Sequence, residues 1–246
     1  MKPRLGVPAD VDAITHVIIN AMPLDPQWPY RFPYRHRYPV DHYKYTRMLI
    51  EYFLDPAYDD WLVMVVEDSP EPGGPTAVVS FGIWDVSYLN RRRYGPGYTP
   101  QDPVTEVQQR GGKTRRDANP QHFAAFRTGQ IKACKQLFGA VRAEQLHLQI
   151  LATHTQFQRR GHASSLCQWA MDLARRDDAL KAMSVMASPM GHPLYARLGF
   201  EWVGALCIQE PGEAERLVLQ AMVYRPGKDA QRLDTIAHGE IYSLVS

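Results

Sequence analysis

The chain has 246 residues, of which 45% are hydrophobic and 22% charged, and its formal net charge is +2. The two percentages are ordinary for a soluble globular protein with an apolar core. A net charge this small does not predict nucleic-acid binding. No segment approaches 18 consecutive apolar residues, so we expect no membrane span.

The three cysteines, Cys134, Cys167 and Cys207, form no CxxC pair, and their number is odd. This pattern favours buried, reduced thiols in an intracellular protein over a disulfide framework. The first residues lack the uninterrupted apolar stretch of a signal peptide. We therefore expect a soluble, cytoplasmic protein that binds neither nucleic acid nor a membrane.

The N-terminal third predicts two helices and a strand pair. Apolar residues at helical spacing predict a helix over residues 8–22. Residues 25–43 are rich in proline and aromatic residues, and the prolines argue against regular helix there. Asp41 is a candidate N-cap of a second helix. Residues 61–67 and 76–85 predict two strands, which form an antiparallel pair because a short turn-rich connector joins them.

The middle of the chain is less regular. Residues 86–120 are polar and rich in Arg, Gly and Pro, which predicts an irregular segment whose basic runs, residues 91–93 and 113–116, are solvated. Residues 121–139 predict a helix, although Gly129 is unfavourable within it. A strand follows at residues 146–152.

The most regular amphipathic pattern of the chain predicts a helix over residues 162–176. A strand at residues 182–187 and a short helix that ends at Gly199 come next. Residues 200–207 and 215–224 predict a final strand pair. This order combines antiparallel hairpins with one strand–helix–strand crossover, and without an internal repeat or a linker it indicates one domain.

The stretch QRRGHA, residues 158–163, lies between a predicted strand and the best predicted helix. The first amides of a helix have no partner within the helix, and the helix dipole makes this end positive. The stretch therefore suits a pyrophosphate, but an ordinary strand–helix turn with exposed arginines explains the same residues equally well. The small, hydroxyl-bearing and basic residues that favour the anion are Arg159, Arg160, Gly161, Ala163, Ser164 and Ser165.

Motifs for other chemistries are absent. The chain has no GxxxxGK[ST], no GxGxxG and no GxSxG, which argues against a P-loop NTPase, a dinucleotide fold and a serine hydrolase. The histidines show no HExxH spacing and do not pair with the cysteines at zinc-site intervals, so no metal site is predicted.

Two segments resemble the GCN5-related N-acetyltransferases (GNAT). QRRGHA matches the pattern Q/R-x-x-G-x-G/A that follows a central strand in that family, and ASPMGHPLYARLGF, residues 187–200, resembles its later region. The order of elements over residues 2–225 resembles the family as well, and DPQW and the strand ending in WD resemble fungal members.

The resemblance implies an α/β (α+β) fold, in which helices flank a central mixed, mostly antiparallel twisted sheet. It implies a single domain over residues 1–225. Residues 86–145 would form a helical insertion between the third and fourth strands of the family fold. Residues 226–246 would form a C-terminal tail.

The resemblance also implies acetyl-CoA as cosubstrate and no metal. Loop amides would bind the pyrophosphate, and the strand before the loop would splay from its neighbour and pair with the pantetheine arm. The residues expected to bind the cofactor are Ile150, Leu151, Ala152, Gln158, Arg159, Arg160, Gly161, His162, Ala163 and Ser164.

The implied reaction is direct acetyl transfer to the primary amine of a small-molecule acceptor. Tyr195 matches the tyrosine that often protonates the departing thiolate, although a packing role is the alternative. Many members use a glutamate on or near the central strand as base, but LHLQILATH contains no carboxylate. His154 and Asp85 are the candidate bases and Glu67 a more distant one; for His154 a structural role is the alternative.

The acceptor would lie against the connection between the first two helices, where aromatic residues alternate with arginines. These residues could hold an aromatic or carboxylate-bearing molecule, or pack the loop onto the domain. The length of the insertion favours a small, enclosed acceptor. Two alternatives stay open: a GNAT-fold protein that binds acyl-CoA or a metabolite without transfer, and an acyltransferase that modifies proteins or uses a longer acyl group. The sequence predicts no oligomeric state.

Overall fold

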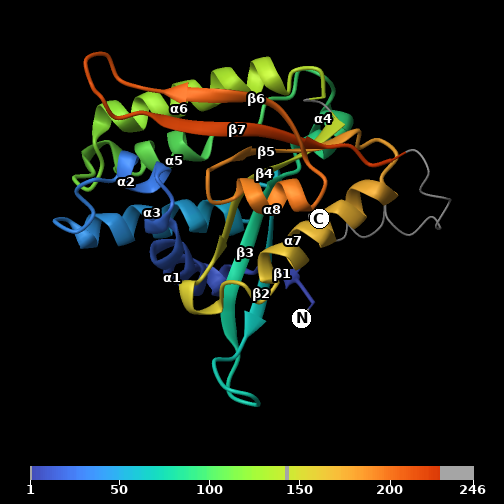
Figure 1. Ribbon diagram of the computed structural model, residues 1–246, viewed down its shortest axis with the longest axis horizontal. Coiled ribbons are helices and arrows are strands. Elements are labelled where there is room, and N and C mark those ends of the chain that lie inside the picture. Colours follow the sequence, from blue (N-terminus) through green and yellow to red (C-terminus); the bar gives the residue numbers. More distant parts are fainter. Residues whose placement is uncertain (1, 142–143, 228–246) are drawn as a thin grey trace.

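The computed structural model describes residues 2–141 and 144–227, which form one seven-stranded sheet in the order β1-β2-β3-β4-β5-β7-β6 (Figure 1). All neighbouring strands are antiparallel except β4 and β5, which are parallel. The strands are β1 (Arg4–Leu5), β2 (Trp61–Asp68), β3 (Ala77–Asp85), β4 (Gln145–Thr153), β5 (Ala182–Ala187), β6 (Glu201–Ile208) and β7 (Leu217–Tyr224).

Eight α-helices pack around this sheet in the described part of the chain. They are α1 (Val11–Ala21), α2 (Gln27–Arg31), α3 (Pro39–Leu54), α4 (Ser87–Tyr94), α5 (Pro103–Gln109), α6 (Pro120–Leu137), α7 (His162–Arg176) and α8 (His192–Arg197). The predicted fold, a mixed and mostly antiparallel sheet flanked by helices with a helical insertion between the third and fourth strands, is confirmed, because α4, α5 and α6 lie between β3 and β4.

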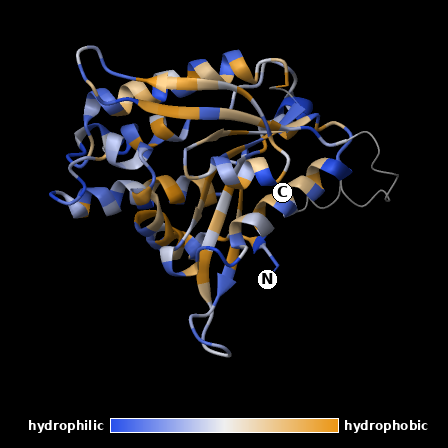
Figure 2. Cartoon of the chain, in the orientation of Figure 1, coloured by the Kyte–Doolittle hydropathy of each residue, from blue (hydrophilic) through white to orange (hydrophobic). Residues whose placement is uncertain are grey.

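Alternation along the strands creates two layers of core. Successive side chains of a strand point to opposite faces of the sheet, so Leu62 and Met64 of β2 pack in the cluster under α7, while Val63 and Val65 pack in the cluster under α1 and α3 (Figure 1). Figure 2 shows hydrophobic residues along these strands and mixed hydropathy on the helices that cover them. Helix α7, residues 162–176 as predicted, buries one apolar stripe.

A third cluster lies between α6 and the β6–β7 hairpin. Gly129 is located at this contact, where a Cβ would lie 3.3 Å from both Ile208 Cγ1 and Leu206 Cδ1. The close approach of helix and strand explains a glycine in the middle of a helix, at the position that made the helical prediction weaker.

Two predictions about the first connection were wrong. Residues 25–43 include the short helix α2. Pro29 is compatible with this helix because it lies in the first turn, where the missing N–H costs no hydrogen bond within the helix. Asp41 does not cap α3, which begins at Pro39. The Asp41 carboxylate instead accepts hydrogen bonds from Arg116, from the backbone amide at 3.0 Å and from Nη2 at 2.8 Å.

The prediction of an irregular backbone over residues 86–120 was also wrong, although Arg92, Arg93, Lys113 and Arg116 of the two basic runs are exposed as predicted. Helices α4 and α5 lie there, and Arg91–Arg93 form the last turn of α4. Arg115 pairs with Asp117 rather than being solvated. Of the cysteines, Cys167 is buried, but Cys134 is half-buried and Cys207 exposed, so burial of all three was wrong as well.

The short strand β1 had no counterpart among the predicted elements. Most of the predicted tail, residues 228–246, lies outside the described residues, and the single domain over residues 1–225 stays a prediction. Among the described residues, no helix combines the length and the apolar content that crossing a bilayer requires.

Candidate active site

The parallel strands β4 and β5 are neighbours over only part of their length. Their pairing ends at Leu148 and Val185, although β4 continues to Thr153. The register between β3 and β4 also shifts at this point and leaves Gln149 as an extra residue of β4, which is a β-bulge. The strand therefore presents the backbone from Gln149 onward on the side from which β5 has separated.

A cavity of about 850 Å³ occupies this opening. One end is lined by the second half of β4, the first turn of α7 and the segment from β5 to α8. The other end is lined by α1, α2, α3 and the insertion helices α5 and α6. Two helices of the insertion, α5 and α6, therefore form part of the cavity wall at this end.

The loop before α7 has an unusual backbone. Arg159 has a φ of 66° and Gly161 a φ of 88°, both in the left-handed region. A Cβ at Gly161 would meet no atom within 4 Å, so it is the backbone conformation that favours glycine there. The backbone amide of Ser165 donates the first hydrogen bond of α7, to the Gly161 carbonyl at 2.9 Å. The amides of the preceding three residues are left without an intrahelical acceptor, at the positive end of the helix dipole.

Most of the predicted cofactor-binding residues come together in this cavity. Arg160 does not, because its guanidinium turns to the outer side of the loop and lies 3.3 Å from the Asp68 carboxylate. The imidazole Nε2 of His162 also contacts Asp68, at 3.0 Å. The predicted residues that line the cavity are Ile150, Leu151, Ala152, Gln158, Arg159, Gly161, His162, Ala163 and Ser164.

Tyr195, on α8, lines the same cavity and is only 5% exposed. Its ring packs against Phe200, with 5.6 Å between ring centroids. Burial, with smaller contributions from Cys167 and Asp25, raises the pKa of the Tyr195 phenol well above its ordinary value. The phenol therefore stays protonated and can donate a proton, which is the state that a general acid needs.

The two candidate bases are not among the described residues that line the cavity. His154 Nδ1 accepts a hydrogen bond from the Gln156 amide at 3.4 Å, just beyond β4. The Asp85 carboxylate accepts one from the Ser87 amide at 2.8 Å, at the start of α4. Both contacts are local ones that stabilise a turn or a helix start. Glu67, the third candidate, accepts a hydrogen bond from Arg4.

Asp25 is the carboxylate that the sequence-based search missed. Of the described residues that line the cavity, it is the only acidic one. It is 7% exposed, and its Oδ1 accepts a hydrogen bond from the Gln27 amide at 3.1 Å. Its charge acts on both Arg31 and Tyr195, whose pKa values it raises. One signal was available, since Asp25 is the only acid in residues 23–40.

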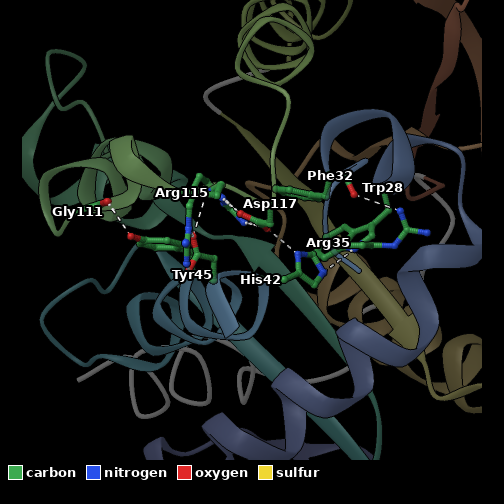
Figure 3. A network of polar contacts seen from close by, with 10 residues as sticks. Trp28, Phe32, Arg35, His42, Tyr45, Gly111, Arg115 and Asp117 are labelled. Carbon is green, nitrogen blue, oxygen red and sulfur yellow. Dashed lines mark hydrogen bonds and ion pairs between the residues drawn. The ribbon is translucent and has the colours of Figure 1, made fainter. Parts of the chain in front are cut away.

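A buried chain of polar contacts lies beside the end of the cavity that α2, α3 and the insertion line (Figure 3). Arg115 donates two hydrogen bonds to Asp117, at 2.8 and 2.7 Å. The Asp117 carboxylate lies 2.7 Å from Nδ1 of His42, and Trp28 Nε1 donates to Nε2 of the same imidazole at 3.1 Å. Because Nε2 accepts, the His42 proton is on Nδ1 and is donated to Asp117. These polar contacts join α2, α3 and the insertion.

Asp117 is at the centre of this chain, and its side chain is fully buried. Burial alone would raise the pKa of its carboxyl, but the hydrogen bonds from Arg115 and His42 outweigh it and lower the pKa below its ordinary value. Trp28 and Arg115 both line the cavity. Their positions, and so the shape of this end, depend on the one carboxylate.

Comparison with known proteins shows that this chain is similar to acetyltransferases. Residues 107–223 match the model of the acetyltransferase (GNAT) domain. A curated protein of Stachybotrys chartarum named "Acetyltransferase" is 25% identical over 224 residues, which is 90% of each chain.

Among solved structures, a Drosophila melanogaster polyamine N-acetyltransferase is 12% identical, covers 91% of this chain and 98% of its own, and has a TM-score of 0.54. A mosquito arylalkylamine N-acetyltransferase like 5b is 15% identical with the same coverage and a TM-score of 0.51. At these identities the two structures establish the shared fold.

Proposed function

The chain belongs to the GNAT superfamily of acetyltransferases, and from this premise we propose that it transfers the acetyl group of acetyl-CoA directly to the primary amine of a small molecule. One observation carries the proposal: the open amides of the loop before α7, the half of β4 that β5 does not pair with, a buried phenol and a carboxylate all line one cavity. We further propose a cytoplasmic location, because an exposed thiol such as Cys207 suits a reducing compartment.

The residues at the α7 end fit the parts of CoA. The free amides of His162, Ala163 and Ser164 and the side chain of Arg159 suit the pyrophosphate. Ile150 to Ala152 offer a strand edge where β5 has separated, which suits the amide groups of the pantetheine arm. No metal is needed for this binding mode, and we propose none.

Three groups divide the chemistry of transfer. The Tyr195 phenol donates a proton to the departing thiolate, and the resulting phenolate takes the second proton from the nitrogen of the tetrahedral intermediate. The Asp25 carboxylate takes a proton from the acceptor ammonium, which must become a neutral amine before it attacks. A backbone amide at the bulge of β4, beside Gln149, donates to the carbonyl oxygen as negative charge develops on it. His154 and Asp85 stay the alternative bases, to be separated from Asp25 by experiment.

A small acceptor fits the other end. Trp28, Phe32, Phe123 and Phe126 give it aromatic walls, and α5 and α6 lie across it. The polyamine and arylalkylamine acetyltransferases named above support a small amine by analogy of fold.

The proposal is tested by following free CoA thiol released from acetyl-CoA in the presence of a panel of small amines, with mass spectrometry of the product. We expect a product 42 mass units above one or more amines, in a reaction that depends on the protein. CoA binding without turnover of any amine would favour a binding protein. Acylation of a lysine peptide alone, or turnover of longer acyl-CoA only, would favour the other alternative.

A further inference from the structure

Arg31 occupies an unusual place in the acceptor end of the cavity. It is the last residue of α2, and its guanidinium carbon lies 4.2 Å from the centroid of Phe126, 5.1 Å from that of Phe32 and 5.3 Å from that of Trp28. Its Nε donates to the Gln27 carbonyl at 3.1 Å and its Nη2 to the Gln27 side chain at 3.4 Å. Nη1 and one hydrogen of Nη2 have no partner among the described residues.

The other arginines of this end are neutralised. Arg115 forms the paired hydrogen bonds with Asp117 described above. Arg127 pairs with Asp102. Arg31 forms no ion pair with a carboxylate in the described part of the chain, although it lines the same end of the cavity.

This guanidinium has a charge that is only partly compensated. Burial, together with the nearby Arg115, lowers the pKa of Arg31 to about 9, which leaves it charged at neutral pH. Asp25 acts in the opposite direction from a greater distance than an ion pair. A half-buried charge without a counterion is less favourable than a solvated one, and an anion at the free edge of the guanidinium would stabilise it.

The distribution of charge fits a ligand with two opposite charges. Asp25 is the acidic residue of the described lining, and Arg31 is close enough for their charges to interact. An ammonium placed at Asp25 would leave a nearby anionic group of the same molecule within the field of Arg31. A planar carboxylate matches the fork of a guanidinium, and the rings of Trp28, Phe32 and Phe126 would contact apolar parts of the molecule.

We infer that the acceptor is an amine that also carries a carboxylate, as an amino acid does, and that Arg31 determines this specificity by binding the carboxylate. The inference rests on the proposed function, since it concerns the acceptor of the same reaction. It predicts that amines of equal size without a carboxylate are poor acceptors.

The test uses product-like probes, so that binding is measured without turnover. N-acetyl derivatives of phenylalanine, leucine and β-alanine, each as the free acid and as the amide, are titrated calorimetrically into the protein with and without saturating CoA. We expect at least one acid to bind about tenfold or more tighter than its amide. This preference should disappear in Arg31→Gln and persist in part in Arg31→Lys.

Arg37→Gln is the matched control, because Arg37 is an exposed arginine that does not line the cavity and whose guanidinium carbon lies 5.4 Å from the ring centroid of Tyr38. It should bind like the wild type. Thermal unfolding of each variant identifies loss of folding. Equal binding of acid and amide in every pair, lack of binding by every acid, or a preference that survives in a folded Arg31→Gln would each overturn the inference.

These titrations, together with the acetyl-transfer assay on the panel of amines, separate this inference from the proposed function. Acetyl transfer to amines without a carboxylate, at rates that a carboxylate does not increase, would overturn the inference and leave the function standing. Acid-selective binding that depends on Arg31, without acetyl transfer to any amine, would support the anionic subsite and contradict the function.

Discussion

The imidazole of His162, the first residue of α7, lies 3.0 Å from the carboxylate of Asp68 at the end of β2. The same carboxylate is 3.3 Å from Arg160 on the other side of Gly161. Burial raises the pKa of Asp68, but the Ser69 amide, His162 and Arg160 lower it more, so the group stays ionised at neutral pH. One carboxylate therefore holds both sides of the proposed pyrophosphate loop.

Replacing Asp68 should loosen that loop. We expect Asp68→Ala to weaken CoA binding by about threefold to tenfold, because ordering the loop would then oppose binding. Calorimetric titration with CoA measures the effect. Asp172→Ala is the control, since Asp172 is a half-buried aspartate of α7 that pairs with Arg175 and does not line the cavity. Equal affinity in Asp68→Ala and wild type would show that the contact does not position the loop.

Removing the Tyr195 hydroxyl should slow transfer more than it weakens binding. We expect Tyr195→Phe to lower kcat by about 10- to 100-fold with little change in CoA affinity, because a general acid contributes at this level. Steady-state kinetics and titration together give the two numbers. Tyr224→Phe, which changes a tyrosine packed on the same Phe200, should leave kcat unchanged. A larger loss of affinity than of rate would assign Tyr195 a packing role.

Three substitutions identify the base. We expect Asp25→Asn to lower kcat/KM by about 10²- to 10⁴-fold, while Asp85→Asn and His154→Gln stay within about threefold of wild type. The reason is position, since only Asp25 of the three lines the cavity. Rates at several pH values and the CoA affinity of each variant complete the comparison. A large loss in His154→Gln or Asp85→Asn, with Asp25→Asn near wild type, would restore the prediction made from the sequence.

The His122–Glu213 contact should make stability depend on pH. His122 Nε2 lies 2.7 Å from the Glu213 carboxylate, and Nδ1 lies 2.9 Å from the Tyr30 carbonyl. Burial lowers the pKa of His122, but the Tyr30 carbonyl and Glu213 raise it more, so the net pKa is raised. A raised histidine pKa contributes stability that is complete below the ordinary value near ~6.5 and is lost as pH rises through the folded value.

This contribution is measured by thermal unfolding of wild type and Glu213→Gln between about pH 5.5 and 8.5, which is roughly the range in which histidine titrates. At the acidic end we expect the melting temperature of the wild type to be about 2–4 °C above that of the variant, since a partly exposed pair contributes about 1 kcal/mol or less to the free energy of unfolding. The difference should vanish at the basic end. A difference that is constant over the range, or that grows with pH, would contradict the assignment of a charged His122.

The elements that position the CoA end could be predicted because their signals are local. Helix α7 has a continuous apolar stripe, and the strand and glycine before it form a compact motif. Helix α4 could not be predicted this way, since its four buried residues, Ser87–Asn90, are consecutive rather than periodic. Contacts from distant segments stabilise it, such as the hydrogen bond from Asn90 to Asp60 at 3.0 Å.

The candidate site could be predicted from the sequence only in part, and the roles of its residues stay proposals. The backbone residues of β4 and the loop follow from the motif, but the direction of a side chain such as Arg160 depends on the left-handed conformation of Arg159. Asp25 was missed because its candidacy arises only when the chain folds. Asp25 and Tyr195 are about 170 residues apart in the sequence, and both line the one cavity.

The central claim is that the loop before α7 binds the pyrophosphate of CoA, and a titration of acetyl-CoA into wild type and Gly161→Asp tests it most directly. Gly73→Asp is the control, because Gly73 has a similar φ of 77° and open space around it, in the connection between β2 and β3. We predict micromolar binding by wild type and Gly73→Asp and none by Gly161→Asp, which places bulk and negative charge against the phosphates. Unchanged affinity in Gly161→Asp, or lack of binding by the wild type, would contradict the claim.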